Sequence, residues 1–215
     1  IGIGSTLSLF YNQSPHQEPS EASIILIMKK IIVVLASILL SLVMFGQEHL
    51  GFKNIPIDGT TSQFIAKLKA VGYTVVGEYS DDIRLTGTFM GKNCTLSVNS
   101  SAVSKTVHTV YVIFDKEQDW ASLKNDYENI KRGLTIKYGK PTVKEEFRSP
   151  YKEGDGYAYI AFKGGYADWI SSFTTAIGYI NLYIREQDYS NMTLIISYCD
   201  KKNYEKSLQE LADEL

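Results

Sequence analysis

The sequence predicts an α+β protein built from two tandem units, each a helix followed by a four-stranded antiparallel sheet, with a short C-terminal helix. Apolar residues recur every three or four positions in two separate segments, which is the period of an amphipathic helix. Each segment is followed by short runs of β-branched and aromatic residues that turn residues divide, a pattern typical of strands. The 215 residues are 44% hydrophobic and 21% charged, as in an ordinary globular protein.

The segment before the predicted domain has the pattern of an export signal. Met28 precedes two lysines and an apolar run, 31–45, that is short for a membrane-spanning helix. We therefore expect 28–46 to be a signal peptide, which places the mature protein in the periplasm or outside the cell. No cysteine lies near the expected cleavage site, so we expect no lipid anchor and membrane contact only during export. A retained anchor is the alternative, and 1–27 is interpreted as upstream sequence outside the domain.

The first unit is predicted at 60–116, after an extended leading segment at 47–59. Its helix is capped by Thr60 or Thr61 and stopped by Gly72. The apolar face of this helix carries Phe64, Leu68 and Val71. Strands are predicted at 73–79, 83–90, 93–99 and 106–114. The last of these strands carries bulk on both faces, because Val110, Val112 and Phe114 alternate with Thr109, Tyr111 and Ile113.

The second unit, 117–215, contains the clearest helical pattern, which Gly139 and Pro141 end. The stripe of this helix consists of Trp120, Leu123, Tyr127, Ile130, Leu134 and Tyr138. Strands are predicted at 142–148, 156–163, 177–185 and 192–198. A C-terminal helix then carries Tyr204, Leu208 and Leu211. We expect each sheet to bury one face under a helix and to leave the other face free.

Two segments carry a resemblance to known proteins. The run Phe52-Lys53-Asn54-Ile55-Pro56-Ile57-Asp58-Gly59 and the ending Leu134-x-x-Lys137-Tyr138-Gly139-x-Pro141 resemble uncharacterised secreted proteins of Bacteroidetes, over nearly all of the mature chain. That resemblance implies no activity. The doubled helix-plus-four-strand plan is also similar to beta-lactamase inhibitory protein, which implies a concave protein-binding sheet on architecture alone. The similar halves are either an internal repeat or the shared patterning of two helix-plus-sheet units.

The chain has two cysteines, Cys94 and Cys199. In an oxidising compartment they could form a disulfide that ties the two units together. The alternative is a pair of separate, half-buried thiols that behave as small apolar residues.

The residue pattern gives no catalytic, metal or cofactor site. His49 and His108 are isolated, and adjacent acidic residues in a strand face opposite sides, so they cannot share a substrate. A net charge of −2 without a cluster of Lys and Arg gives no reason to expect nucleic acid as a partner. A hydrolase acting on envelope peptides or polysaccharides would need His108, Asp115 and Asp200 to converge.

One aromatic segment is the candidate binding surface. Tyr166, Trp169 and Phe173 lie in a predicted connection, 164–175, that is long for a hairpin. They could form an exposed anchor cluster, or the loop could fold back so that they cover the core. The leading hypothesis is a noncatalytic binding or inhibitory module of the cell envelope, whose partner is another protein or an envelope component. The hydrolase is the alternative.

Overall fold

The computed structural model describes residues 28–30, 48–80, 82–117, 119–187 and 191–215. Residues 1–46 and 47–215 form separate units, and the helices and strands given below all belong to the second. The predicted signal segment after residue 30 lies outside the described residues, as does 1–27. In the part of the chain that is described, no helix is both long and apolar enough to cross a membrane.

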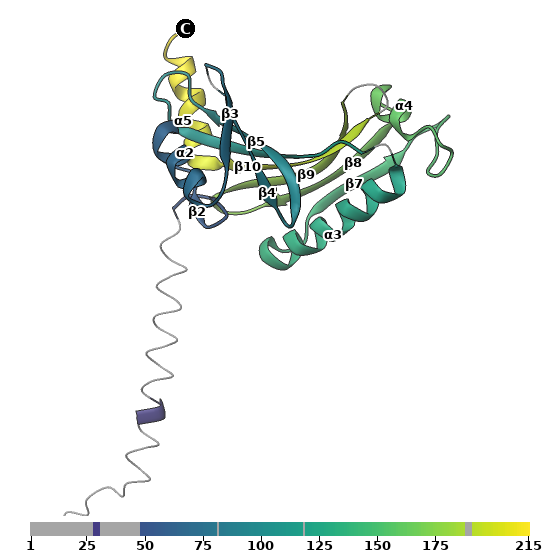
Figure 1. Cartoon of the computed structure of the whole chain (residues 1–215), viewed down its shortest axis with the longest axis horizontal. Helices are drawn as coiled ribbons and strands as arrows, with labels where there is room; N and C mark the ends of the chain where they lie inside the picture. Colours follow the sequence, from purple (N-terminus) through teal and green to yellow (C-terminus); the bar gives the residue numbers. More distant parts are fainter. Residues whose placement is uncertain (1–27, 31–47, 81, 118, 188–190) are drawn as a thin grey trace, which may run out of the picture. The chain divides into compact units, whose positions relative to one another are not determined.

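One eight-stranded antiparallel sheet organises the domain, in the order β3-β4-β5-β6-β10-β9-β8-β7 (Figure 1). Its strands are β3 (Thr74–Glu78), β4 (Asp82–Phe89), β5 (Lys92–Ser100), β6 (Val107–Phe114), β7 (Thr142–Phe147), β8 (Ala167–Thr174), β9 (Gly178–Glu186) and β10 (Met192–Asp200). The α+β class is therefore confirmed. The expectation of two separate sheets is wrong, because β6 and β10, the last strands of the two meanders, pair with Ile196 opposite Val112. This pairing removes two open sheet edges.

The helices begin where the sequence supplies caps. They are α2 (Thr61–Ala70), α3 (Trp120–Tyr138), α4 (Ala158–Lys163) and α5 (Lys201–Ala212). The Thr60 side chain accepts from the N–H of Gln63, and the Gln63 side chain accepts from the N–H of Thr60, which makes a capping box. Asp119 caps α3, and Gly139 ends it with φ of 85°. The cap at Thr60 and the stop at Gly139 agree with the predictions, whereas the cap at Asp119 was not predicted.

The hydrophobic core lies between α2, α3, α4 and one face of the sheet. The α3 stripe supplies Leu123, Tyr127, Ile130 and Leu134. The sheet supplies alternate residues, so that Leu96, Val112, Ile196 and Leu182 meet across four neighbouring strands. Alternation sends the residues between them to the opposite face.

The second half differs from its prediction between residues 156 and 174. The predicted strand 156–163 is instead helix α4, which buries Ala161 and Phe162 as neighbours on one helical face. The predicted long loop is instead strand β8, in which Ala167, Trp169, Ser171 and Phe173 alternate inward. The second meander therefore uses β8 as the strand that follows β7.

The leading segment forms a hairpin rather than an extended stretch. Strands β1 (Gly51–Phe52) and β2 (Ile55–Pro56) are joined by Lys53 and Asn54, both at positive φ. The hairpin lies close to the sheet at Gly178, where an added Cβ would be 2.3 Å from the carbonyl oxygen of Cys199 and would also crowd Leu50. A glycine there lets the leading segment pack directly onto β9 and β10.

Candidate binding surface on the open face of the sheet

The sheet carries a second apolar row on the face opposite the core. Strand register places Ile113 of β6, Ile195 of β10, Tyr183 of β9 and Ile170 of β8 side by side. None of the four belongs to the core cluster or to the side chains packed against it. This set, together with Tyr111 one row away, is called the open face below.

Polar side chains without formal charge flank the open face on one side. The neighbouring row runs across five strands and consists of Ser97, Tyr111, Ser197, Asn181 and Ser172. The amide of Asn181 donates to the hydroxyl of Ser197 at 3.4 Å. Ser97 donates to the Asp82 carboxylate at 2.6 Å. The centre of the surface therefore carries aromatic rings, aliphatic side chains, hydroxyl groups and one amide.

The charged residues near this face lie toward its margins. Arg84 pairs with Asp82 on β4, at 3.1 Å. Lys144 on the edge strand β7 pairs with Asp168 on β8, at 2.6 Å. An apolar centre with a polar and charged rim is the usual anatomy of a protein interface.

The helices leave most of the open face accessible. Helices α2, α3 and α4 contribute their buried residues to the core cluster. Figure 1 shows α3 along the opposite side of the sheet. Helix α5 approaches one corner, where Tyr204 interacts electrostatically with Tyr111. Tyr111, Ile113, Ile170 and Tyr183 are each partly exposed, whereas Ile195 in the middle of the row is 7% exposed because its neighbours cover it.

Partial burial sets the ionisation of the two central tyrosines. Loss of hydration raises the pKa of Tyr111, and Cys199 and Tyr204 raise it further. Loss of hydration also raises the pKa of Tyr183, while Arg185 opposes the rise. Both phenols are therefore neutral at physiological pH and can donate a hydrogen bond at the surface.

The structure buries two residues of the predicted aromatic cluster and exposes the third. Trp169 is 6% exposed and Phe173 is 1% exposed, whereas Tyr166 is 43% exposed. Trp169 packs edge-on against Trp120, with ring centroids 5.0 Å apart. Of the two alternatives, the exposed three-residue anchor is therefore wrong, and the structure supports the other for Trp169 and Phe173, which cover the core because β8 turns them inward. Tyr166 remains at the surface beside Tyr151.

The two cysteines are free and lie on different parts of the sheet. Cys94 pairs opposite Phe114, and Cys199 opposite Thr109, on either side of β6. Positions 109 and 114 are an odd number of residues apart, so the two side chains face opposite sides of the sheet. A disulfide needs Cα atoms within about 7 Å, whereas five residues of strand span about 17 Å. The structure supports the alternative of two separate thiols.

The three residues of the hydrolase hypothesis do not converge. His108 lies near the start of β6, and Asp115 follows its end, about 23 Å away along an extended strand. Asp200 is fully buried, and its carboxylate accepts from the backbone N–H groups of Leu50 and Asn203. These hydrogen bonds therefore organise the fold around the end of β10.

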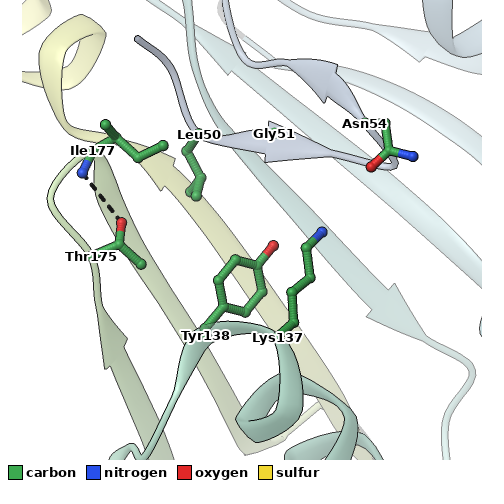
Figure 2. A pocket seen from close by; sticks show the side chains of 7 residues that line it. All are labelled: Leu50, Gly51, Asn54, Lys137, Tyr138, Thr175 and Ile177. Atoms are coloured by element: carbon green, nitrogen blue, oxygen red, sulfur yellow. Dashed lines mark hydrogen bonds between the residues drawn. The ribbon is translucent and has the colours of Figure 1, made fainter. Parts of the chain in front are cut away.

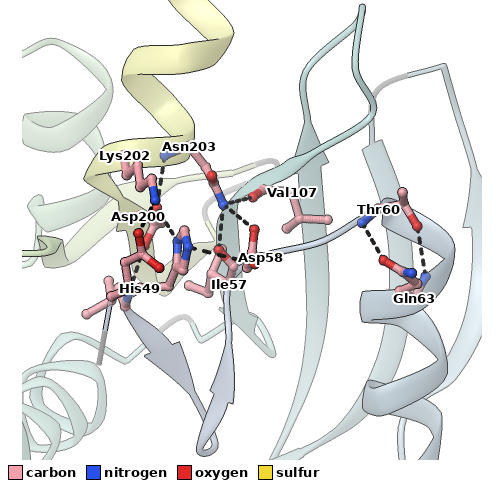
Figure 3. A network of polar contacts seen from close by, with 11 residues as sticks. His49, Ile57, Asp58, Thr60, Gln63, Val107, Asp200, Lys202 and Asn203 are labelled. Atoms are coloured by element: carbon pink, nitrogen blue, oxygen red, sulfur yellow. Dashed lines mark hydrogen bonds and ion pairs between the residues drawn. The ribbon is translucent and has the colours of Figure 1, made fainter. Parts of the chain in front are cut away.

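That buried carboxylate belongs to a network that the sequence does not reveal. Asp200 also contacts the ring of His49, at 3.2 Å (Figure 3). The Asn203 side-chain amide donates to the carbonyl oxygens of Ile57 and Val107. The network therefore fastens the leading segment to β6 and α5. Leu50 and Asp200 are 150 residues apart, and no local pattern reports such a pairing.

A small pocket lies beside the leading hairpin (Figure 2). Its volume is about 260 Å³, and it is lined by Leu50, Gly51, Asn54, Lys137, Tyr138, Thr175 and Ile177. Asn54 comes from the first segment that carries the resemblance described above, and Lys137 and Tyr138 come from the second. Figure 2 shows Lys137 and Tyr138 extending from the end of α3 toward the hairpin. The pocket is slightly smaller than the range of about 300–1,000 Å³ usual for small-molecule sites.

Among the described residues, no group of three or more His, Cys, Asp and Glu side chains could hold a metal ion. No family model, curated protein or solved structure matches this chain.

Proposed function

We propose that residues 47–215 form an exported, noncatalytic binding module of the bacterial envelope, which docks another protein on the open face. One observation carries this proposal. Ile113, Ile195, Tyr183 and Ile170 form a continuous apolar row across four strands and stand outside the core.

The chemistry of the open face suits a protein partner. Tyrosine provides a large contact area and a hydroxyl for a modest loss of side-chain entropy, so it is common among residues that dominate binding energy. Tyr111 and Tyr183 stand on β6 and β9, which both pair with β10 at the centre of the sheet, and this holds them in place before a partner arrives. The uncharged centre avoids the high desolvation cost of burying unpaired charges.

A docked partner on the open face also explains why β6 carries large side chains on both of its faces. Val110 and Val112 face the core, whereas Tyr111 and Ile113 face outward. On a strand that faced only water on that side, an isoleucine would contribute no more than its cross-strand packing. A docked protein would bury the row and recover its hydrophobic free energy.

Affinity capture followed by reconstitution tests the proposal. Protein comprising residues 47–215 is immobilised and exposed to an envelope extract, and each captured protein is then purified and titrated against the bait. The test variant is Tyr111→Thr combined with Tyr183→Thr, because threonine keeps β propensity while it removes both rings. We expect the variant to lose at least about tenfold in affinity for the purified partner.

The matched control is Tyr157→Thr, which removes a tyrosine that is 56% exposed and lies just before α4. We expect this variant to bind as the wild type does. A partner that binds the folded double variant and the wild type equally would reject the open face as the docking site.

A further inference from the structure

The leading hairpin has a free backbone edge beside the pocket of Figure 2. The N–H of Ile57 donates to the carbonyl oxygen of Leu50 at 2.8 Å, and Gly51 is the next residue along β1. Hydrogen-bonded and non-hydrogen-bonded pairs alternate along an antiparallel ladder, so the N–H and C=O of Gly51 point away from β2. The strand that carries Gly51 is the one nearer to Lys137 and Tyr138 in Figure 2, so this edge is turned toward the pocket.

The backbone N–H of Gly51 is a buried donor. Gly51 is a buried residue, and within the described part of the chain its N–H donates to no carbonyl or side-chain oxygen. A buried backbone donor without a partner costs free energy comparable to a lost hydrogen bond. An acceptor that enters the pocket beside Gly51 would supply that partner. The N–H therefore favours a ligand that presents an oxygen at this edge of the hairpin.

Side-chain donors gather around the same pocket. The Lys137 ammonium and the Tyr138 hydroxyl extend toward the hairpin, and Asn54 stands at its turn (Figure 2). Of the described residues that line the pocket, Lys137 alone is charged, and it makes no ion pair within the described part of the chain. Its ammonium lies 5.1 Å from the centre of the Tyr138 ring. The pocket therefore combines one positive charge with uncharged hydrogen-bond donors.

The chain's own acceptors near this pocket are already engaged. The Asp200 carboxylate is not part of the lining, and it accepts from the N–H groups of Leu50 and Asn203. The Thr175 hydroxyl donates to the carbonyl oxygen of Gly178, so it does not serve Lys137 either. Donors thus outnumber acceptors among the polar groups that face the pocket, which suits an anionic ligand.

We propose that this pocket binds a small organic acid by its carboxylate. The carboxylate accepts from the Lys137 ammonium, the Tyr138 hydroxyl and the Gly51 N–H. The apolar part of the acid lies against Leu50 and Ile177, which also line the pocket. One positive charge matches a monoanion, whereas the second charge of a phosphate group would be left without a partner. The volume of about 260 Å³ restricts the ligand to a small molecule.

We expect weak binding, because two features of the site reduce the attraction for an anion. Helix α3 ends at Tyr138, and the C-terminal end of a helix carries partial negative charge. Lys137 is exposed, so solvent and salt screen its ammonium. For a short-chain acid we therefore expect a dissociation constant on the order of 1–10 mM.

Nuclear magnetic resonance of isotope-labelled protein, residues 47–215, tests the proposal by titration with sodium butyrate at constant ionic strength. The amide resonance of Gly51 should shift and saturate, because its N–H gains the carboxylate as an acceptor. Butyramide has the same carbon chain without the charge, and it should give no saturable shift over the same concentrations.

Two variants and a control assign the donors. Lys137→Met removes the ammonium and keeps the aliphatic chain, and it should weaken butyrate binding by at least about tenfold. Tyr138→Phe removes only the hydroxyl and should weaken binding about two- to tenfold. The control is Lys140→Met, which removes an exposed lysine that does not line the pocket and should leave the affinity unchanged. The amide spectrum of each variant shows whether the fold is kept.

The proposal is overturned if Gly51 shows no saturable shift up to about 100 mM butyrate, or if the folded Lys137→Met variant binds butyrate as tightly as the wild type. Tighter binding of inorganic phosphate than of butyrate would reject the carboxylate as the preferred group. The tripeptide acetyl-Gly-Gly-Val carries the same carboxylate on a larger body, and we expect it to bind less tightly than butyrate. Tighter binding of the tripeptide would overturn the small acid in favour of the end of a peptide chain.

Discussion

The carboxylate of Asp200 accepts a 2.7 Å hydrogen bond from the backbone N–H of Leu50, which joins the leading segment to the start of α5. The same carboxylate caps α5 through the N–H of Asn203, at 2.9 Å. One fully buried side chain therefore satisfies donors from two segments that are distant in sequence.

Replacing this carboxylate should destabilise the domain. Asp200→Ala should lower the free energy of unfolding by about 3 kcal/mol, because it removes a helix cap and leaves the Leu50 donor buried without a partner. Chemical denaturation measures the loss. The control is Asp119→Ala, which removes the exposed cap of α3 and should cost distinctly less. Equal losses of unfolding free energy in the two variants would show that the Asp200 network contributes no stability beyond the helix cap.

The corrected position of β8 leads to a second prediction. Trp169→Ala should cost about 3–5 kcal/mol, because it empties a buried site between Trp120 and Phe147. Tyr166→Ala should cost less than about 1 kcal/mol, since that side chain is largely at the surface. Thermal or urea unfolding of the two variants measures the difference. If both variants lost similarly little free energy of unfolding, Trp169 would have to lie at the surface. That result would contradict its inward position in β8.

The burial of His108 predicts a dependence of stability on pH. Desolvation lowers the pKa of His108, against an opposing hydrogen bond to the backbone of Ser100. In the unfolded chain a histidine titrates near about 6.5, so below that pH the unfolded state binds a proton that the folded state binds less readily. Stability should therefore fall as the pH drops from about 7.5 to about 5.5.

The variant His108→Phe keeps a ring against Tyr204 and removes the titrating group. Unfolding measured across the same pH range should show a smaller decline for this variant than for the wild type. Identical pH profiles would mean that His108 has the same proton affinity in both states.

The separation of the cysteines predicts two independent thiols. Burial raises the pKa of Cys94 to about 11, and burial also raises the pKa of Cys199. We expect an alkylating reagent at neutral pH to modify the partly exposed Cys199 slowly and Cys94 only after unfolding. Peptide mass spectrometry checks the order. An intramolecular Cys94–Cys199 disulfide in the purified protein would contradict the register of β5, β6 and β10.

The sequence predicted the elements whose signals are local. The α3 stripe, its stop at Gly139 and the alternation in β6 gave the correct helix and strand with nearly correct bounds. Segment 156–163 was predicted as a strand because its aromatic residues favour strands. It contains helix α4, and Ala158, Ala161 and Phe162 do follow helical spacing. Strand β8 was missed because Ser171 interrupts an otherwise apolar inward row.

Features that depend on distant pairing could not be predicted. The contact between β6 and β10 joins strands about 80 residues apart, and it turns two predicted sheets into one. Tyr111 and Ile113 were recognised as bulk on the second face, but their alignment with Ile195 and Tyr183 follows only from the register. Likewise, the helical spacing of Tyr204, Leu208 and Leu211 was visible in the sequence, whereas their exposure was not.

The most direct test of the docking surface compares stability with affinity in the Tyr111→Thr, Tyr183→Thr variant. Both residues lie outside the core, so the free energy of unfolding should change by no more than about 1 kcal/mol. Titration calorimetry with the purified partner should nevertheless show at least about a tenfold loss of affinity. Unchanged affinity in the folded variant would contradict the account and place the binding site elsewhere on the molecule.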